Sequence, residues 1–165
     1  MPQTAKVSAS ITLTKTATPD GGSAKVEQAL SMLKSIASGV GSGQADLGFI
    51  DLARTLASNT SEDFDLAGSL VDALGATVTC VEIVALMIQA SAANTTNLTI
   101  GGASDEWQGP FAAAGDKIVL RPGEAVLFFS DTGWAVGAGA SDDLLIANAA
   151  GATAAFDIGF IGRSA

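Results

Sequence analysis

The chain begins with a strict alternation of apolar and polar side chains. The apolar positions that share one face of an extended chain are Val7, Ala9, Ile11 and Leu13, and serines and threonines lie between them. A period of two with β-branched residues is typical of a half-buried strand. The stretch 19–22, Pro-Asp-Gly-Gly, has the composition of a turn. We therefore predict a strand over residues 6–16 that ends in this turn.

Residues 22–38 allow two interpretations. Apolar side chains at spacings of three and four predict an amphipathic helix that ends at Gly39, and they are Val26, Ala29, Leu30, Leu33, Ile36 and Ala37. A strand is the alternative, because the sequence on both sides is β-like. Residues 39–43 (Gly-Val-Gly-Ser-Gly) form a flexible joint. This joint divides the chain into an N-terminal arm, residues 1–43, and a body, residues 44–165.

The body has the pattern of many short strands separated by turns. The strongest candidate for a core strand is 77–90, which is long, β-branched and nearly uniformly apolar. Arg121, Pro122 and Gly123 predict a type II turn that joins strands 117–120 and 124–130 as a hairpin. Further strands are expected within 47–57, 62–66, 97–101, 134–136, 144–147 and 153–161.

About nine or ten strands at this spacing are typical of an antiparallel sandwich or jelly roll. No alternation of strands and helices suggests a parallel α/β sheet. The predicted fold is therefore all-β (mainly β): an antiparallel β-sandwich or jelly roll, with an N-terminal arm that contains at most one short helix.

The composition removes several kinds of chemistry. The 165 residues include no His, no Tyr and one Cys. His-based triads, His metal sites, internal disulfides and multi-Cys zinc sites are therefore excluded. Cys80 lies within an apolar strand, which predicts an inert core thiol. The glycine-rich segments match no phosphate-binding fingerprint. We expect no enzyme activity, no catalytic residue and no cofactor.

The charge is acidic and unevenly distributed. The formal net charge is −9, which disfavours nucleic acid and anionic membranes as partners. Residues 1–40 hold four lysines and two acids, a net +2, whereas residues 41–165 hold four basic and fifteen acidic residues, a net −11. A mildly basic arm on a strongly acidic body can guide contact between neighbouring copies. A chance distribution of a few lysines is the simpler alternative.

Three groups of carboxylates are candidates for functional sites. They are Glu62, Asp63 and Asp65, then Asp105 and Glu106, then Asp142 and Asp143. A glycosidase needs two facing carboxylates, and an oxygen-only calcium site needs a suitable ligand spacing. No loop here has the spacing of a known calcium motif, so solvated strand ends and turns are the favoured interpretation, and no metal site is expected.

Three aromatic residues beside loops are candidates for an interface. Trp107 and Phe111 lie in a turn-rich stretch, and Trp134 follows Thr132-Gly133. Such rings either anchor an interface or close the open ends of the sandwich. Together with Lys6 and Lys15 of the arm, they are the candidate interface residues.

The N-terminus has no apolar stretch like that of a signal peptide, so synthesis in a cytoplasm is expected. The apolar run 78–90 is too short to span a membrane and includes Glu82. We therefore expect no membrane partner.

An ordered set of short segments runs from residue 44 onward. The segments are Gln44-Ala45-Asp46, Arg54-Thr55-Leu56-Ala57, residues 62–70 (EDFDLAGSL), Asp72-Ala73-Leu74-Gly75, Ala92-Ala93-Asn94-Thr95, Gly101-Gly102-Ala103, Leu120-Arg121-Pro122-Gly123, Gly133-Trp134-Ala135-Val136 and Phe156-Asp157-Ile158. This set resembles a family of small virion proteins of tailed bacteriophages, encoded near the major capsid protein. The resemblance covers residues 44–162. Residues 20–40 depart from the family pattern, because family members are more strand-like there. This disagrees with the helix interpretation.

The resemblance implies a capsid decoration, or cement, protein on the exterior of the head. Such a protein is synthesised in the host bacterial cytoplasm, binds the major capsid protein, forms a homotrimer and stabilises the shell. An arm could add a strand to a neighbour. The alternative is a glycan-binding or adhesion module of a phage fibre or tail, in which Trp107 or Trp134 stacks on sugars. A glycan hydrolase that uses Asp142 or Glu62 is the third hypothesis.

Overall fold

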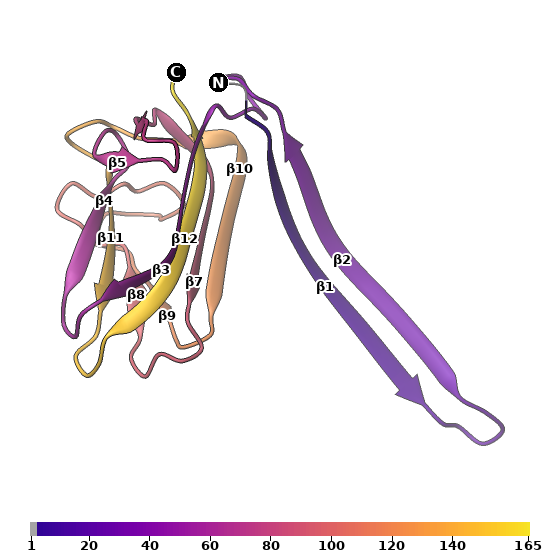
Figure 1. Cartoon of the computed structure of the whole chain (residues 1–165). Helices are drawn as coiled ribbons and strands as arrows, with labels where there is room; N and C mark the ends of the chain where they lie inside the picture. The colour runs from indigo at the N-terminus through magenta and orange to yellow at the C-terminus, as the bar shows by residue number, and fades with distance from the viewer. Residues whose placement is uncertain (1–2) are drawn as a thin grey trace.

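The fold is a sandwich of two four-stranded antiparallel sheets, seen in a computed structural model that describes residues 3–165 (Figure 1). The first sheet has the order β10-β7-β12-β3 and the second the order β4-β11-β8-β9. Their bounds are β3 (Leu47–Leu56), β7 (Glu82–Ala90), β10 (Ala125–Ala135) and β12 (Ala154–Arg163), then β4 (Ser61–Asp65), β8 (Leu98–Ile100), β9 (Ile118–Leu120) and β11 (Asp143–Asn148).

This strand order is that of an eight-stranded jelly roll. Consecutive strands of the body mostly alternate between the two sheets, and the last strand, β12, lies between β7 and β3. A small separate pair, β5 (Leu70–Val71) and β6 (Thr77–Val78), is inserted between β4 and β7. The prediction of an all-β antiparallel sandwich is confirmed.

The core is formed by alternate residues of both sheets. Phe64, Ile88, Ile146 and Ile158 are fully buried and belong to one cluster. Phe64 and Phe156 meet edge to face across the sandwich, with ring centroids 6.3 Å apart. Of the residues that the structure describes, none before Leu47 contributes to this cluster, so the body has its own core.

The predicted strand 77–90 is divided in two. β6 ends at Val78 and β7 begins at Glu82. Between them, the Cys80 amide donates to the Leu66 carbonyl and the Val81 amide donates to the Arg163 carbonyl. The backbone thus changes its hydrogen-bonding partners at residues 79–81. Residues 77–90 therefore cannot form one continuous strand with a single set of partners.

The turn at Arg121–Gly123 forms, but the predicted hairpin does not. The Glu124 amide donates to the Arg121 carbonyl at 3.0 Å, and Gly123 has φ 81°, as a type II turn requires. However, β9 pairs with β8 and β10 pairs with β7. The Ala90 amide donates to the Glu124 carbonyl, which directs the chain to β7. The turn therefore carries the chain from one sheet to the other.

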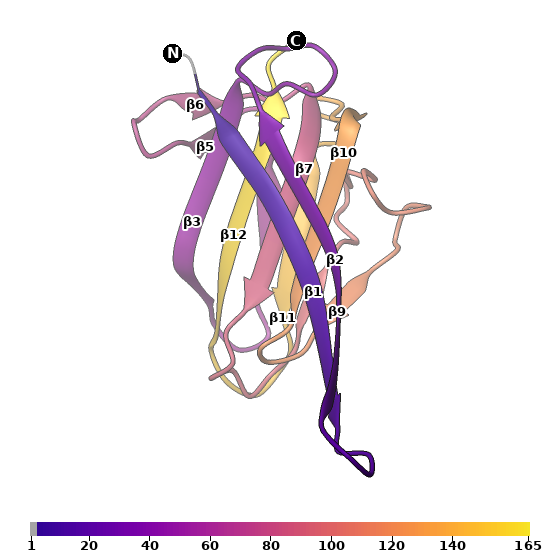
Figure 2. The ribbon, with the colours of Figure 1, turned by 90° about the vertical axis from the view of Figure 1, so that its right-hand side faces the viewer.

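The arm is a long β-hairpin, and the predicted helix is wrong. β1 (Ala5–Ala17) and β2 (Ala24–Ile36) pair antiparallel without interruption from Ala5↔Ile36 to Ala17↔Ala24. This pairing places Leu30 opposite Ile11 and so extends the apolar face of β1. A helix would have left the ladder groups of β1 without partners, so the strand alternative won. Figure 2 shows the hairpin crossing in front of the first sheet.

The segment between β2 and β3 attaches the hairpin to the body. The predicted boundary at residues 43 and 44 lies in this segment. The Gly39 amide donates to the Ala45 carbonyl at 3.3 Å, and the Gly43 amide donates to the Asp131 carbonyl at 2.9 Å. These bonds restrain the glycine-rich joint and fix the direction in which the arm leaves the sandwich.

Candidate functional site: two apolar surfaces without a partner

The outer faces of the two sheets have opposite character. On the second sheet, the outward positions include Asp63, Asp65 and Asp143, and the last two are cross-strand partners. This is the usual pattern of an antiparallel sheet with one face in water. The first sheet carries mainly apolar side chains on its outer face as well as toward the core. A sheet that is apolar on both faces is normally covered on both.

We call the apolar surface of the first sheet the outer face. It comprises Ile50, Leu52, Ala85, Met87, Leu127 and Ile161. Its central row runs across all four strands, because Leu127 lies opposite Met87, Met87 opposite Gly159, and Gly159 opposite Ile50. Gly159 contributes no side chain to the middle of the row, and the Ile50 side chain lies beside it. Ile50 is 71% exposed and Met87 is 45% exposed, so this row is open to solvent.

A second apolar surface lies on the hairpin. The register places Ala9 opposite Met32, Ile11 opposite Leu30, and Lys15 opposite Val26, all on one face. We call this the arm face and define it by Val7, Ala9, Ile11, Leu13, Val26 and Leu30. The opposite face is built from Ser8, Ser10, Ser31 and several threonines, with Leu33 as its large apolar residue. Beyond its base the arm face is exposed, with Ile11 at 71% and Leu30 at 74%.

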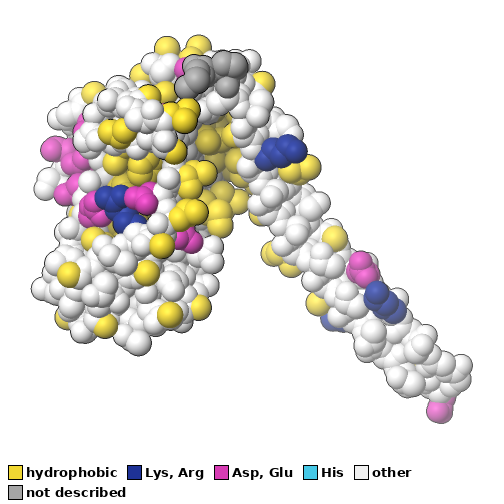
Figure 3. Space-filling view, in the orientation of Figure 1, with side chains coloured by type: hydrophobic (Ala, Val, Ile, Leu, Met, Phe, Trp, Pro, Cys, Tyr) yellow, Lys and Arg dark blue, Asp and Glu magenta, His cyan; other side chains and the backbone are white. Residues whose placement is uncertain are grey.

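The two surfaces meet only at the base of the hairpin. There Val7 and Ile36 are buried with Val84 and Ala85, and Met32, Leu127 and Phe129 pack around them. Further along, the hairpin leans away from the sandwich (Figure 1). Hydrophobic side chains are visible on both sides of the space that opens between them (Figure 3).

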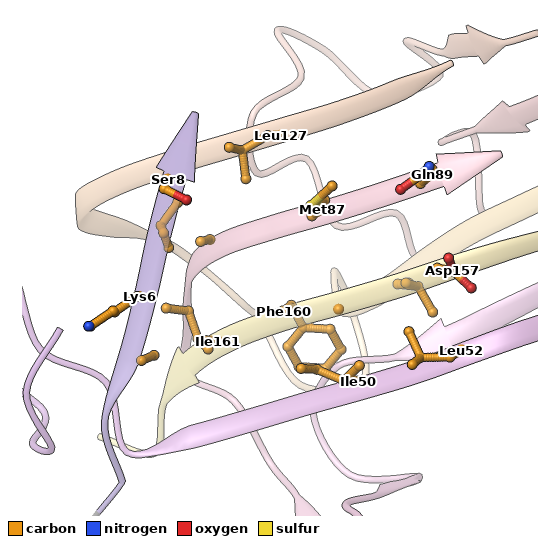
Figure 4. Close-up of a pocket in the computed structure, with 15 residues that line it drawn as sticks. Lys6, Ser8, Ile50, Leu52, Met87, Gln89, Leu127, Asp157, Phe160 and Ile161 are labelled. Atoms are coloured by element: carbon orange, nitrogen blue, oxygen red, sulfur yellow. The ribbon is translucent and has the colours of Figure 1, made fainter. Parts of the chain in front are cut away.

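The space between the arm and the first sheet contains a hollow of about 380 Å³. Figure 4 shows Ile50 and Leu52 on one side of it, Met87 and Leu127 on the other, and β1 across one end. Asp157 and Gln89 are its polar lining residues on the sheet. The hollow is therefore an apolar slot with a polar edge, and it suits a hydrophobic protein segment better than a polar small molecule.

Charged groups fix the base of the arm. Lys34 donates to Asp131 at 2.7 Å, and its Nζ lies 5.4 Å from the centre of the Phe129 ring. Arg163, 2% exposed, pairs with Glu82 and also donates to the carbonyls of Gln44, Thr132 and Asp131. Arg163 thus joins the end of β12 to the segment that carries the arm and to the irregular part of β10.

The structure separates the residues predicted as interface candidates. Lys6 and Lys15 are exposed on β1; Lys6 lines the hollow, and Lys15 lies toward the tip of the hairpin. Trp107 is 1% exposed, and its Nε1 donates to the Ala135 carbonyl at 3.0 Å.

The rings form one chain of edge-to-face contacts, from Trp107 to Trp134 (6.3 Å), from Trp134 to Phe128 (6.4 Å) and from Phe128 to Phe111 (6.2 Å). Trp107 therefore occupies the position of a plug in the sandwich, while Phe111 and Trp134 are half-buried around it. In this structure Trp107 offers no surface to a partner.

Each of the three groups of carboxylates includes a side chain with a structural partner. Glu62 accepts a hydrogen bond from Arg54 Nε at 2.8 Å, and Asp142 accepts one from the Gly139 amide at 2.6 Å. Glu106 is buried and accepts from the amides of Gly102 and Gly115. Between residues 3 and 165, no three acidic or cysteine side chains are grouped so as to hold a metal ion. These contacts anchor loops and strand ends.

The single cysteine is buried, as the sequence predicts. Burial, with a smaller contribution from the charge of Asp46, raises the pKa of the Cys80 thiol to about 12. The thiolate is therefore nearly absent at neutral pH, and the thiol is unreactive in the folded chain.

Asp143 gives a prediction about pH. Burial raises its pKa first, and the neighbouring carboxylates Asp63, Asp142, Asp65 and Asp105 raise it further. A raised folded-state pKa means that the folded chain binds this proton more tightly than the unfolded chain, so ionised Asp143 destabilises the fold above that pKa. Asp143→Asn should increase the free energy of unfolding at pH 7 by up to about 1 kcal/mol. The gain should disappear below about pH 4, where the carboxyl is protonated in both states.

Urea unfolding of both chains at pH 7 and pH 3.5 measures this difference. Asp20→Asn, at the exposed turn of the hairpin, is the matched control and should change stability little at either pH. A loss of stability in Asp143→Asn at pH 7 would contradict the prediction.

The outer face and the arm face are absent from the candidates derived from the sequence. A signal for the first was available, because β7 is nearly uniformly apolar and such a strand is buried on both faces. The second needed the register of β2, which the helix interpretation conceals.

Comparison with protein-family models, with curated protein sequences and with solved structures gives no match. In the part of the chain that the structure describes, there is no helix of the length and apolarity that crossing a membrane requires.

Proposed function

We propose that this chain is a structural protein of a tailed-bacteriophage virion, a capsid decoration protein that binds the exterior of the head and stabilises the shell. The observation that carries the proposal is the pair of apolar surfaces, the arm face and the outer face, which one copy leaves without a partner. Exposed apolar patches of this kind mark sites of protein–protein association.

The ordered segments described above support the phage assignment, and the fold is compatible with it. Jelly rolls occur in viral capsid proteins and in lectins, so the fold alone is only an analogy. The acidic outer face of the second sheet would remain hydrated on the outside of a particle and would not bind nucleic acid. The partners in this proposal are the major capsid protein and further copies of the chain, arranged as a trimer.

Removal of the arm tests the proposal. None of residues 3–46 belongs to the sandwich core, so a chain that lacks residues 1–40 should still fold. We expect the full chain to cosediment with undecorated shells of the phage that encodes it, and the truncated chain to remain in the supernatant. Far-UV circular dichroism of the truncated chain should retain the β spectrum. Unimpaired shell binding without the arm would remove the arm from the mechanism. A map of purified virions that lacks this chain would reject the function.

A further inference from the structure

We propose that the arm face of one copy packs on the outer face of a second copy, so that neighbouring chains exchange hairpins. The partner of the apolar slot is then the hairpin of another identical chain. This inference deepens the proposed function by naming what covers the outer face, but its evidence lies in the chain itself.

Both surfaces lack a cover in one copy. Ile11 and Leu30 form a cross-strand pair on the hairpin and are both more than 70% exposed. An isolated two-stranded hairpin is marginally stable in water at best. The distal half of this hairpin contributes no residue to a buried cluster. It therefore needs an apolar surface of another molecule to be held in this conformation.

The contacts at the base of the hairpin set the direction of the arm. The base of the hairpin is fixed by the ion pair of Lys34 and Asp131, by a bond from the Gln3 side chain to the Leu47 carbonyl, and by Ala45 bonded to Ala37. These contacts direct the distal half away from its own sheet, and its tip lies beyond the end of the sandwich (Figures 1 and 2). At about 3.3 Å per residue, thirteen-residue strands span roughly 43 Å. The arm thus reaches a neighbour.

The two surfaces also match in shape and in charge. The arm face presents branched side chains, and the hollow lined by Ile50, Met87 and Gly159 on the outer face can receive one of them. The charges also agree, because residues 1–40 carry +2 and residues 41–165 carry −11. Lys15 lies on the arm face and Asp157 borders the slot. Attraction between the arm of one copy and the acidic body of another copy favours exchange over an arm that stays free.

The donor and acceptor surfaces differ, so each copy donates one arm and accepts one. Two copies can satisfy both surfaces reciprocally, and three can do so in a closed ring such as the proposed trimer.

Cross-linking with introduced cysteines tests the exchange. We would mix a tagged chain carrying Leu30→Cys with an untagged chain carrying Ile50→Cys and oxidise mildly. A disulfide-linked heterodimer is expected. Cys80 stays in both chains, since it is buried, and the chain without added cysteine should give no product. The matched control is Ser31→Cys mixed with Ile50→Cys, because Ser31 lies next to Leu30 but on the polar face of the hairpin; we expect at least a tenfold lower yield from it.

A second measurement does not depend on cysteine chemistry. Light scattering should show an oligomer for the unmodified chain and a monomer for Leu30→Asp, whereas Ser31→Asp should remain oligomeric. Position 30 is exposed, so folding should persist, and circular dichroism checks this.

Two outcomes would overturn the proposal. One is an unmodified chain that is monomeric, together with no heterodimer from the mixture of Leu30→Cys and Ile50→Cys chains. The other is a Leu30→Cys/Ile50→Cys double variant that closes only within one chain, since the arm would then fold onto its own sheet.

These experiments use no capsid shells. Arm exchange without shell binding would reject the proposed function alone, and shell binding by a chain that stays monomeric would reject the exchange alone.

Discussion

Arg163→Met should lower the free energy of unfolding by about 3 kcal/mol. The guanidinium is almost fully buried and donates to the carbonyls of Gln44, Thr132 and Asp131 at 3.0, 2.8 and 2.6 Å, besides its pairing with Glu82. Methionine fills a similar volume but donates nothing, so these acceptors lose their charged partner. Glu82 is one-third exposed and can be hydrated, which keeps the cost below that of a fully buried unpaired charge.

Urea unfolding followed by tryptophan fluorescence measures the loss. Arg121→Met is the matched control, because the Arg121 side chain is exposed, and it should change stability by less than about 0.5 kcal/mol. The variant should also increase proteolysis of the segment between β2 and β3, because Gln44 loses its attachment to β12. A loss below about 1 kcal/mol, with proteolysis unchanged, would show that Arg163 does not hold this junction.

The contrast between Arg163 and Cys80 shows which parts of the molecule the sequence alone could predict. Cys80 lies in a local apolar context, and that context is enough to predict a buried thiol. Arg163 lies two residues from the C-terminus, and its partners are 31 to 119 positions away. Its role depends on long-range contacts that no local pattern encodes. The alternation in β1 and the apolar run of β7 were local in the same sense as Cys80, and both predicted strands.

The two wrong predictions, the helix and the hairpin, also result from long-range contacts. The spacing of apolar residues in β2 fits a helix, but pairing with β1 outweighs that weak local preference. Arg121–Gly123 forms the predicted turn, although a turn does not determine which sheet the next strand joins. The two unpartnered surfaces depend on the pairing of β2 with β1 and on which sheet each strand joins. The arm face exists only when β2 pairs with β1, and the outer face only when β3, β7, β10 and β12 lie in one sheet.

Trp107→Ala should lower the free energy of unfolding by about 3–5 kcal/mol, because it removes a buried indole and leaves a cavity. The Ala135 carbonyl also loses its donor, and Trp134 loses its edge-to-face neighbour. Trp134→Ala removes a half-buried ring from the same cluster and should cost less. Urea unfolding followed by far-UV circular dichroism measures both, since the tryptophan signal itself is changed.

The loss of stability in Trp107→Ala distinguishes a residue that closes the sandwich from a residue that anchors an interface. A residue that closes the sandwich affects stability, whereas an interface anchor affects binding and leaves the isolated fold nearly unchanged. Trp107→Phe should recover a large part of the loss, because the phenyl ring fills much of the space although it cannot donate to Ala135. If Trp107→Ala instead unfolds at the same urea concentration as the unmodified chain and loses binding to a glycan or to a shell, Trp107 acts at an interface. Trp107 would then again be a candidate residue for the glycan-binding alternative, which its burial argues against.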